Sequence, residues 1–243
     1  MRSFFLALQF LTIFPIKHSL QFESEDFKKA LYFFPLIGMI IGSLLTAFWL
    51  MLGGLPVLAR TVLLVGFNIL LSGALHIDAF ADTCDGLYGF HSKEKALRIM
   101  RESRIGVMGA AAIVWLLISK IVFISGISQT HVFKVLFCLP VFSRWVMSFA
   151  CCNTAYARKE GKAKLFIENA NPKVILLNGV LIFGLFVFSW RLKGAMIFLL
   201  SLLCVYIYKQ YVQKRIEGMS GDTVGAANEI SEWLILFFVL LIL

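Results

Sequence analysis

Apolar runs long enough to cross a lipid bilayer recur along this chain, and they constrain its fold more than any other feature. Six runs qualify, and they cover residues 33–52, 57–75, 107–125, 132–151, 174–190 and 194–211. A helix needs about 17–25 mainly apolar residues to span the hydrocarbon core. Because 60% of the 243 residues are hydrophobic and only 15% are charged, we expect lipid to be the solvent. The sequence predicts an all-α, polytopic integral membrane bundle of about 6–7 transmembrane helices, forming a single domain over residues 1–243.

Two further apolar stretches lie near the ends of the chain. The stretch at 3–16 has Pro15 near its end and is followed by Lys17 and His18 rather than by the small residues of a cleavage site, so we expect an interfacial or re-entrant segment. The stretch at 233–243 is too short to cross alone unless Ile230 and its neighbours extend it.

Gly38 and Gly42 form a Gly-x-x-x-Gly pair inside the first predicted span. Small residues at this spacing permit the close approach of two helices. The partner helix is either in the same chain or in a second copy, so a homo-oligomer is a possible assembly.

The basic residues are divided unevenly between the two faces of the predicted bundle. One face receives residues 1–32, 76–106, 152–173 and 212–232, with sixteen of the 23 lysines and arginines, against three on the other face. The positive-inside rule makes the richer face cytoplasmic. All 14 acidic residues are expected on the same face. We therefore expect a protein of the cell membrane whose active site lies on the cytoplasmic face. Anionic headgroups and substrate phosphates explain the net charge of +9 without a nucleic acid partner.

The first polar segment, 73–109, carries three aspartates at helical spacing. Asp78, Asp82 and Asp85 occupy positions i, i+4 and i+7, which share one face of a helix. Crowded carboxylates repel one another unless a cation neutralises them. Hard oxygen ligands favour Mg²⁺, which keeps several waters and shares its site with substrate phosphates. The alternative interpretation is a solvated helix face.

A second polar segment, 218–232, is rich in glycine and alanine. Asp222 and Glu229 are seven residues apart, hence on one helical face, and Glu232 extends that face. The small residues around them allow a helix or ligand to approach closely. We therefore hypothesise that Asp82 and Asp85 converge with Asp222 around one or two metal ions that hold a pyrophosphate.

Basic and histidine side chains complete the candidate site. Arg98, Arg101 and Arg104 recur at every third residue and offer planar donors suited to phosphate. The basic loop at 153–173 is either a phosphate-contacting cap or a solvated loop. His76 is a metal ligand, a general base or a hydrogen-bond partner, although lone histidines are more often structural.

Lys120, Lys134 and Arg144 are among the basic residues that fall within the predicted spans, where a charge is costly. Lys120 and Lys134 lie near span ends, so we expect them to extend to the headgroups. Arg144 lies nearer the middle of its span, and we expect it to face a polar cavity and to contribute to phosphate binding.

These motifs, taken together, resemble the cobalamin synthase family over essentially the whole chain. The resemblance is carried by residues 9–12, 34–38, 75–78, 81–86, 99–106 and 220–226. In one departure, Glu102 stands where the family pattern has Asp.

The resemblance implies an adenosylcobinamide-GDP ribazoletransferase that uses Mg²⁺. In this reaction a hydroxyl of α-ribazole, or of its 5′-phosphate, attacks the phosphate next to cobinamide, and GMP leaves. Phosphoryl transfer of this kind depends on positioning and electrostatic stabilisation. On this basis Asp82, Asp85 and Asp222 are assigned to metal, and Asp78, His76 and Glu229 are candidates for the base or for supporting roles.

Two other functions remain open at this stage. A CDP-alcohol phosphotransferase is suggested by Asp82-x-x-Asp85-Gly86 and by an aspartate at 222. However, the Ala-Arg pair expected after the glycine is missing, and Ala226 stands where an acid should be. A transporter is the alternative from another class, although the acidic residues cluster at one face and no repeat relates the two halves.

Overall fold

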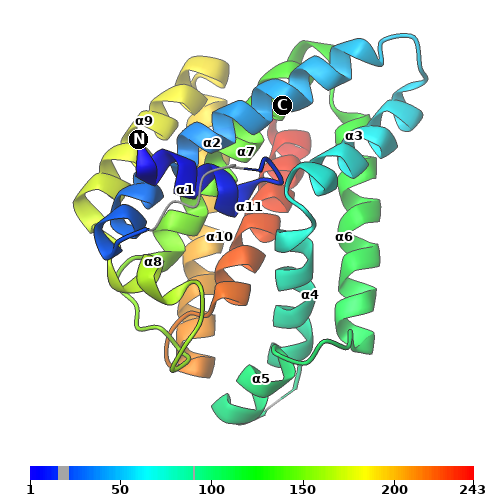
Figure 1. The fold of residues 1–243 in the computed structure, drawn as a ribbon. Coiled ribbons are helices and arrows are strands. Elements are labelled where there is room, and N and C mark those ends of the chain that lie inside the picture. Colours follow the sequence, from blue (N-terminus) through cyan, green and yellow to red (C-terminus); the bar gives the residue numbers. More distant parts are fainter. Residues whose placement is uncertain (16–21, 90) are drawn as a thin grey trace.

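The computed structural model describes residues 1–15, 22–89 and 91–243, and these residues form eleven helices (Figure 1). The helices are α1 (Arg2–Leu11), α2 (Ser24–Met51), α3 (Val57–Leu71), α4 (Leu75–Leu87), α5 (Lys93–Ile99), α6 (Val107–Gly126), α7 (Gln129–Cys151), α8 (Lys164–Glu168), α9 (Pro172–Trp190), α10 (Leu192–Ile216) and α11 (Gly221–Ile242). Among the described residues, six helices are long and apolar enough to cross a membrane, namely α2, α6, α7, α9, α10 and α11. The prediction of a polytopic helical membrane protein is confirmed.

The second predicted span, 57–75, is not one straight helix. The chain bends by 89° between α3 and α4. Gly73 and Ala74 both have φ of +59°, and the Ser72 hydroxyl donates back to the carbonyls of Asn68 and Ile69. A left-handed conformation ends an α-helix, so α3 ends at Leu71, four residues before the end of the predicted span, and α4 continues in another direction.

The C-terminal apolar stretch does belong to a longer helix. α11 begins at Gly221 and runs for 22 residues to Ile242, so the second polar segment forms the first half of this helix rather than a loop. α11 packs against α4, α6, α7 and α10 and is one of the most buried helices of the bundle. Its early residues therefore enter the interior of the protein.

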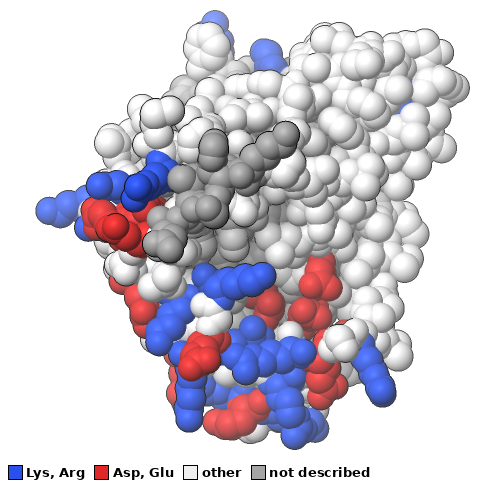
Figure 2. Space-filling view, in the orientation of Figure 1, with Lys and Arg blue, Asp and Glu red and all other residues white. Residues whose placement is uncertain are grey.

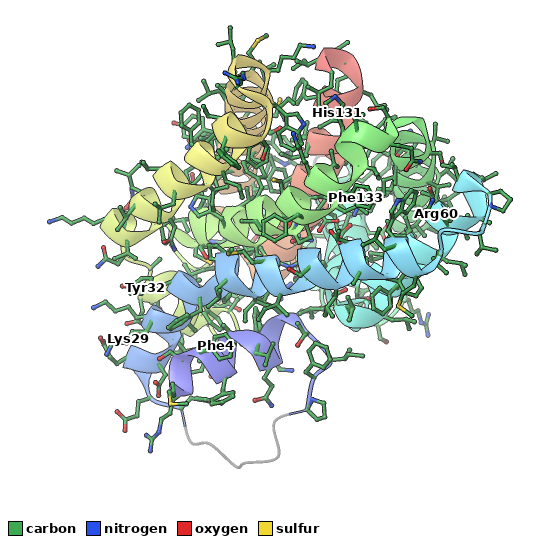
Figure 3. The ribbon with its side chains drawn as sticks, turned by 90° about the horizontal axis from the view of Figure 1, so that it is seen from above. Phe4, Lys29, Tyr32, Arg60, His131 and Phe133 are labelled. Atoms are coloured by element: carbon green, nitrogen blue, oxygen red, sulfur yellow. The ribbon has the colours of Figure 1, made fainter. Side chains whose placement is uncertain are left out.

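The N-terminal helix α1 has ten residues, fewer than a membrane crossing needs. It runs beside the start of α2 (Figure 3). The Ser3 hydroxyl donates to Asp26, and the rings of Phe4 and Phe33 lie 5.9 Å apart. The end of the predicted 3–16 segment and Lys17 lie outside the described residues, and an interfacial location remains a prediction.

The Gly-x-x-x-Gly pair is used inside the chain. A β-carbon added at Gly38 would collide with the carbonyl oxygen of Pro140, and one added at Gly42 would collide with that of Phe137. The absence of side chains on α2 thus lets it lie directly against the backbone of α7. This face of α2 is already buried and is not free to form a dimer.

Candidate functional site

The acidic faces of α4 and α11 meet at one end of the bundle. Gly225 of α11 lies against Ala79 of α4, where a β-carbon on the glycine would sit 2.6 Å from the alanine methyl. α11 starts at this place because Ser220 and Thr223 form a capping box, in which each side chain accepts a hydrogen bond from the other residue's backbone N–H. The start of α11 is thereby fixed against α4, and Asp222 is brought beside the α4 carboxylates.

The carboxylates of this site act on one another electrostatically. Asp82 experiences repulsion from Asp78, Asp222 and Asp85, whereas Arg158 attracts it. Arg158 forms an ion pair with Asp222. A single arginine beside several carboxylates leaves an excess of negative charge, which favours the binding of a cation.

Arg158 is a site residue that the sequence did not single out, apart from the general expectation for the basic loop at 153–173. Its position depends on a short backbone pairing between this loop and the segment before α11. Ala157 N–H donates to the Met219 carbonyl, and Met219 N–H donates to that of Ala155, both at 2.9 Å. Nothing in the local sequence identifies this pairing, because its two sides are about 60 residues apart.

Asp85 has a different environment from Asp82. Its two oxygens accept hydrogen bonds from the backbone N–H groups of Gly106 and Gly109, at 2.7 and 2.8 Å. These glycines lie at the start of α6, where free N–H groups and the helix dipole favour an anion. Asp85 thus connects α4 to α6.

The donor set suits Mg²⁺ in its chemistry. In the part of the chain that the structure describes, no three His, Cys, Asp or Glu side chains stand close enough to hold an ion as they are placed. However, the carboxylates of Asp78 and Asp82 accept no hydrogen bond from any described residue, and oxygen is the ligand atom that Mg²⁺ prefers. The oxygens of Asp78, Asp82 and Asp222 are therefore the group best able to take up such an ion, and Mg²⁺ remains a prediction.

A cavity of about 230 Å³ opens beside these carboxylates. Asp78, Asp222 and Arg158 line it together with Lys162 and Tyr156, and most of the other lining side chains are apolar. His76 also lines the cavity, with only 1% of its surface exposed. Neither ring nitrogen of His76 has a hydrogen-bond partner among the described residues.

Two of the four predicted phosphate-binding arginines line a shallow surface groove of about 610 Å³. Arg98 and Arg101 lie there together with Arg158 and the loop lysine Lys159. Arg101 donates to the Glu160 carbonyl at 3.0 Å. Arg104 is exposed in the segment before α6 and does not line this groove.

Glu229 and Arg144 do not lie with the carboxylate cluster of α4. They belong to a buried ionic network in which Lys120 contacts Glu229 at 2.5 Å and Glu232 at 2.7 Å. Arg144 contacts Glu232 at 2.9 Å and also donates to Asn228. The network joins α6, α7 and α11 within the bundle.

Two expectations about charge placement are corrected by this network. Lys120 does not extend to the headgroups: it is 5% exposed and paired with two carboxylates of α11. Glu229 and Glu232, 4% and 0% exposed, lie inside the bundle rather than on the polar face with the other acidic residues. The signal that could have found the network is the pair of basic residues, Lys120 and Arg144, within apolar spans, since such charges need buried partners.

The fold and the site define a class of protein: a multi-pass membrane protein with an anionic, cation-attracting site at one end of its helical bundle. The model of a family described as cobalamin-5-phosphate synthase matches residues 3–240, and the chain belongs to that family. It is therefore an enzyme with a role in cobalamin synthesis.

Curated relatives support this assignment over nearly their full lengths. The chain is 38% identical to an adenosylcobinamide-GDP ribazoletransferase of Alkaliphilus metalliredigens (strain QYMF), covering 100% of this chain and 96% of the relative. It is 36% identical to the protein of the same description from Alkaliphilus oremlandii (strain OhILAs), with 96% and 95% covered. For Clostridium novyi (strain NT) the identity is 33%, with 96% and 94% covered. No solved structure matches the chain.

Proposed function

We propose that this chain transfers the cobinamide phosphate of adenosylcobinamide-GDP to α-ribazole or to α-ribazole 5′-phosphate, and that GMP is released. The observation that carries the proposal is the meeting of Asp78 and Asp82 with Asp222, beside a basic loop, at one end of an apolar bundle. The family to which the chain belongs and the names of its relatives supply the substrate classes.

We assign the cation site to Asp82 and Asp222. Mg²⁺ held there would supply positive charge to stabilise the pyrophosphate and the leaving GMP. Asp85 supports the site by fixing the start of α6 against α4. Arg158 balances part of the negative charge on Asp222.

The acceptor hydroxyl forms a bond to the phosphorus next to cobinamide, and the bond from that phosphorus to the bridging oxygen breaks. The electron pair of that bond leaves with GMP. Asp78 is exposed, lines the cavity and has no described partner, so we assign to it the proton of the attacking hydroxyl. Arg98 and Arg101, in the adjoining groove, are suited to hold the phosphate of the departing GMP.

The site is proposed to face the cytoplasm. Figure 2 shows that most of the charged side chains on this side of the molecule gather at the end that carries α5, and that few lie on the opposite end. Basic segments are retained on the cytoplasmic side of a membrane. This orientation gives the site access to soluble phosphorylated substrates.

The decisive experiment uses the full chain reconstituted in lipid vesicles. Adenosylcobinamide-GDP, α-ribazole 5′-phosphate and Mg²⁺ are supplied, and GMP and the corrinoid product are measured for the wild type, Asp82→Asn and Asp26→Asn. We expect the wild type to turn over, and chelation of the metal to abolish this turnover. Asp82→Asn should lower the turnover rate at least 100-fold, which is the effect of losing one electrostatic stabiliser of the transition state. Asp26→Asn should leave the rate unchanged. Asp26 is a suitable control because its carboxylate caps α2, away from α4.

The other outcomes distinguish the alternatives. A folded wild type that transports substrate without releasing GMP would favour the transporter. Turnover that survives Asp82→Asn would retain the reaction but remove the proposed metal site.

A further inference from the structure

The cavity beside the carboxylates has an aromatic wall built from three separate helices. Phe10 of α1, Phe34 of α2 and Phe166 of α8 all line it. The ring centroid of Phe166 lies 4.7 Å from that of Phe10 and 5.7 Å from that of Phe34. Aromatic walls of this kind accept the face or edge of another ring.

The size of the cavity restricts what it can hold. At about 230 Å³ it is smaller than the ~300–1,000 Å³ of sites that take drug-sized ligands. A bicyclic aromatic ring is the scale of group that fits, whereas a corrin macrocycle is far too large. Asp78, Asp222 and Arg158 line the same cavity, so a ring bound inside it would have its attached sugar close to the proposed reaction site.

His76 is a buried polar group of this cavity whose hydrogen-bonding capacity is unused. It is 1% exposed, and both of its ring nitrogens lack a partner among the described residues. A buried polar group without a hydrogen bond is costly. Neutral histidine offers one N–H donor and one acceptor nitrogen, so a ligand with a single ring nitrogen could accept the bond that His76 has available.

Two aromatic bases take part in the proposed reaction, and they differ in polarity. Guanine, in the donor, presents several N–H donors as well as acceptors. Among the polar groups that line this cavity, Asp78, Asp222 and Arg158 serve the proposed reaction site, and the Tyr156 hydroxyl donates to the Glu160 carbonyl. His76 and the exposed Lys162 are left, and they offer too few acceptors for the N–H groups of guanine. The benzimidazole base of a ribazole is apolar and has one free ring nitrogen, which is an acceptor. The chemistry of the cavity therefore matches the base of the acceptor and not that of the donor.

We infer that this cavity is the binding site for the acceptor's benzimidazole base, with the ring between the aromatic wall and α11 and with His76 donating a hydrogen bond to its free nitrogen. The inference rests on the proposed function and adds the determinant of acceptor specificity to it. His76 is then a recognition residue, while Asp78, two positions further along α4, receives the proton.

The test measures the Michaelis constant of each of the two substrates separately, for the wild type and for variants of the vesicle-reconstituted enzyme. His76→Leu removes the hydrogen-bonding nitrogens, and His76→Gln keeps a donor. We expect His76→Leu to raise the KM for α-ribazole 5′-phosphate roughly tenfold, the effect of losing one buried hydrogen bond. The KM for adenosylcobinamide-GDP should stay unchanged, and His76→Gln should fall between His76→Leu and the wild type.

His131→Leu is the matched control. This histidine accepts a hydrogen bond from Trp190 near the start of α7, whereas α7 reaches the cavity at Met147, about 24 Å further along at 1.5 Å per residue. Both Michaelis constants should be unchanged in this variant. An unchanged acceptor KM in His76→Leu, or a rise in the donor KM alone, would overturn the inference while leaving the proposed reaction in place.

A second measurement needs no substitution. Free 5,6-dimethylbenzimidazole should inhibit the wild type competitively against the acceptor, and guanosine should not. Inhibition competitive with adenosylcobinamide-GDP, or no inhibition by the free base, would show that the cavity does not hold the acceptor's ring. A wild type that releases no GMP would overturn both this inference and the proposed function.

Discussion

The two buried carboxylates of α11 should differ sharply in their contribution to stability. Glu232 is fully buried and contacts two cations, Lys120 at 2.7 Å and Arg144 at 2.9 Å, whereas among the described residues Glu229 contacts one cation, Lys120. In Glu232→Gln, Arg144 loses its only carboxylate partner within the described residues. Removing one partner of a buried pair costs about 3–5 kcal/mol. In Glu229→Gln, Lys120 keeps Glu232, so the loss is that of one charged hydrogen bond, about 1.5–3 kcal/mol.

The assay is equilibrium unfolding of the detergent-solubilised full chain, followed by helix content. Glu25→Gln is the control, because Glu25 forms only exposed pairs with Lys28 and Lys29 and should change the unfolding free energy by less than about 1 kcal/mol. Equal losses for the Glu232 and Glu229 variants would refute the reasoning, because they would show that the second cation adds nothing. A loss at Glu232 as small as that at Glu25 would show that water reaches the network.

Three further predictions follow from particular contacts. In Asp85→Asn, one of two backbone N–H groups at the start of α6 loses the carboxylate oxygen that accepts its hydrogen bond. The unfolding free energy should therefore fall by about 1 kcal/mol. Unchanged stability with lost activity would instead support a metal-ligand role for Asp85. Gly38→Ala places a methyl group against the Pro140 carbonyl and should lower the unfolding free energy by about 1–3 kcal/mol. Gly66→Ala is the control, because a β-carbon there has nothing within 4 Å, and it should not destabilise the folded chain. Equal effects of the two variants in thermal unfolding would contradict the close approach of α2 and α7. Arg101→Gln removes a cation from the groove and should raise the KM for adenosylcobinamide-GDP roughly tenfold, and a rise confined to the acceptor would reassign the groove.

Much of the candidate site follows from local spacing. Asp78 and Asp82 are one helical turn apart, so any helix through them places both carboxylates on one face. The glycine and alanine residues around Asp222 indicated a close approach, and Gly225 does lie against Ala79. Spacing did not separate Asp85 from Asp82, because that difference depends on the start of α6, which approaches from more than 20 residues away.

The sequence by itself determined that this protein is a bundle of apolar helices in a membrane, because the cost of exposing backbone and charge to lipid depends mainly on the length and composition of each run. It also identified the two acidic segments. Only the tertiary structure decided which charges meet. Lys120 and Glu229 are 109 residues apart, and Arg158 and Asp222 are 64 apart. Pairings at such separations are set by the packing of whole helices, and no local pattern of residues encodes them.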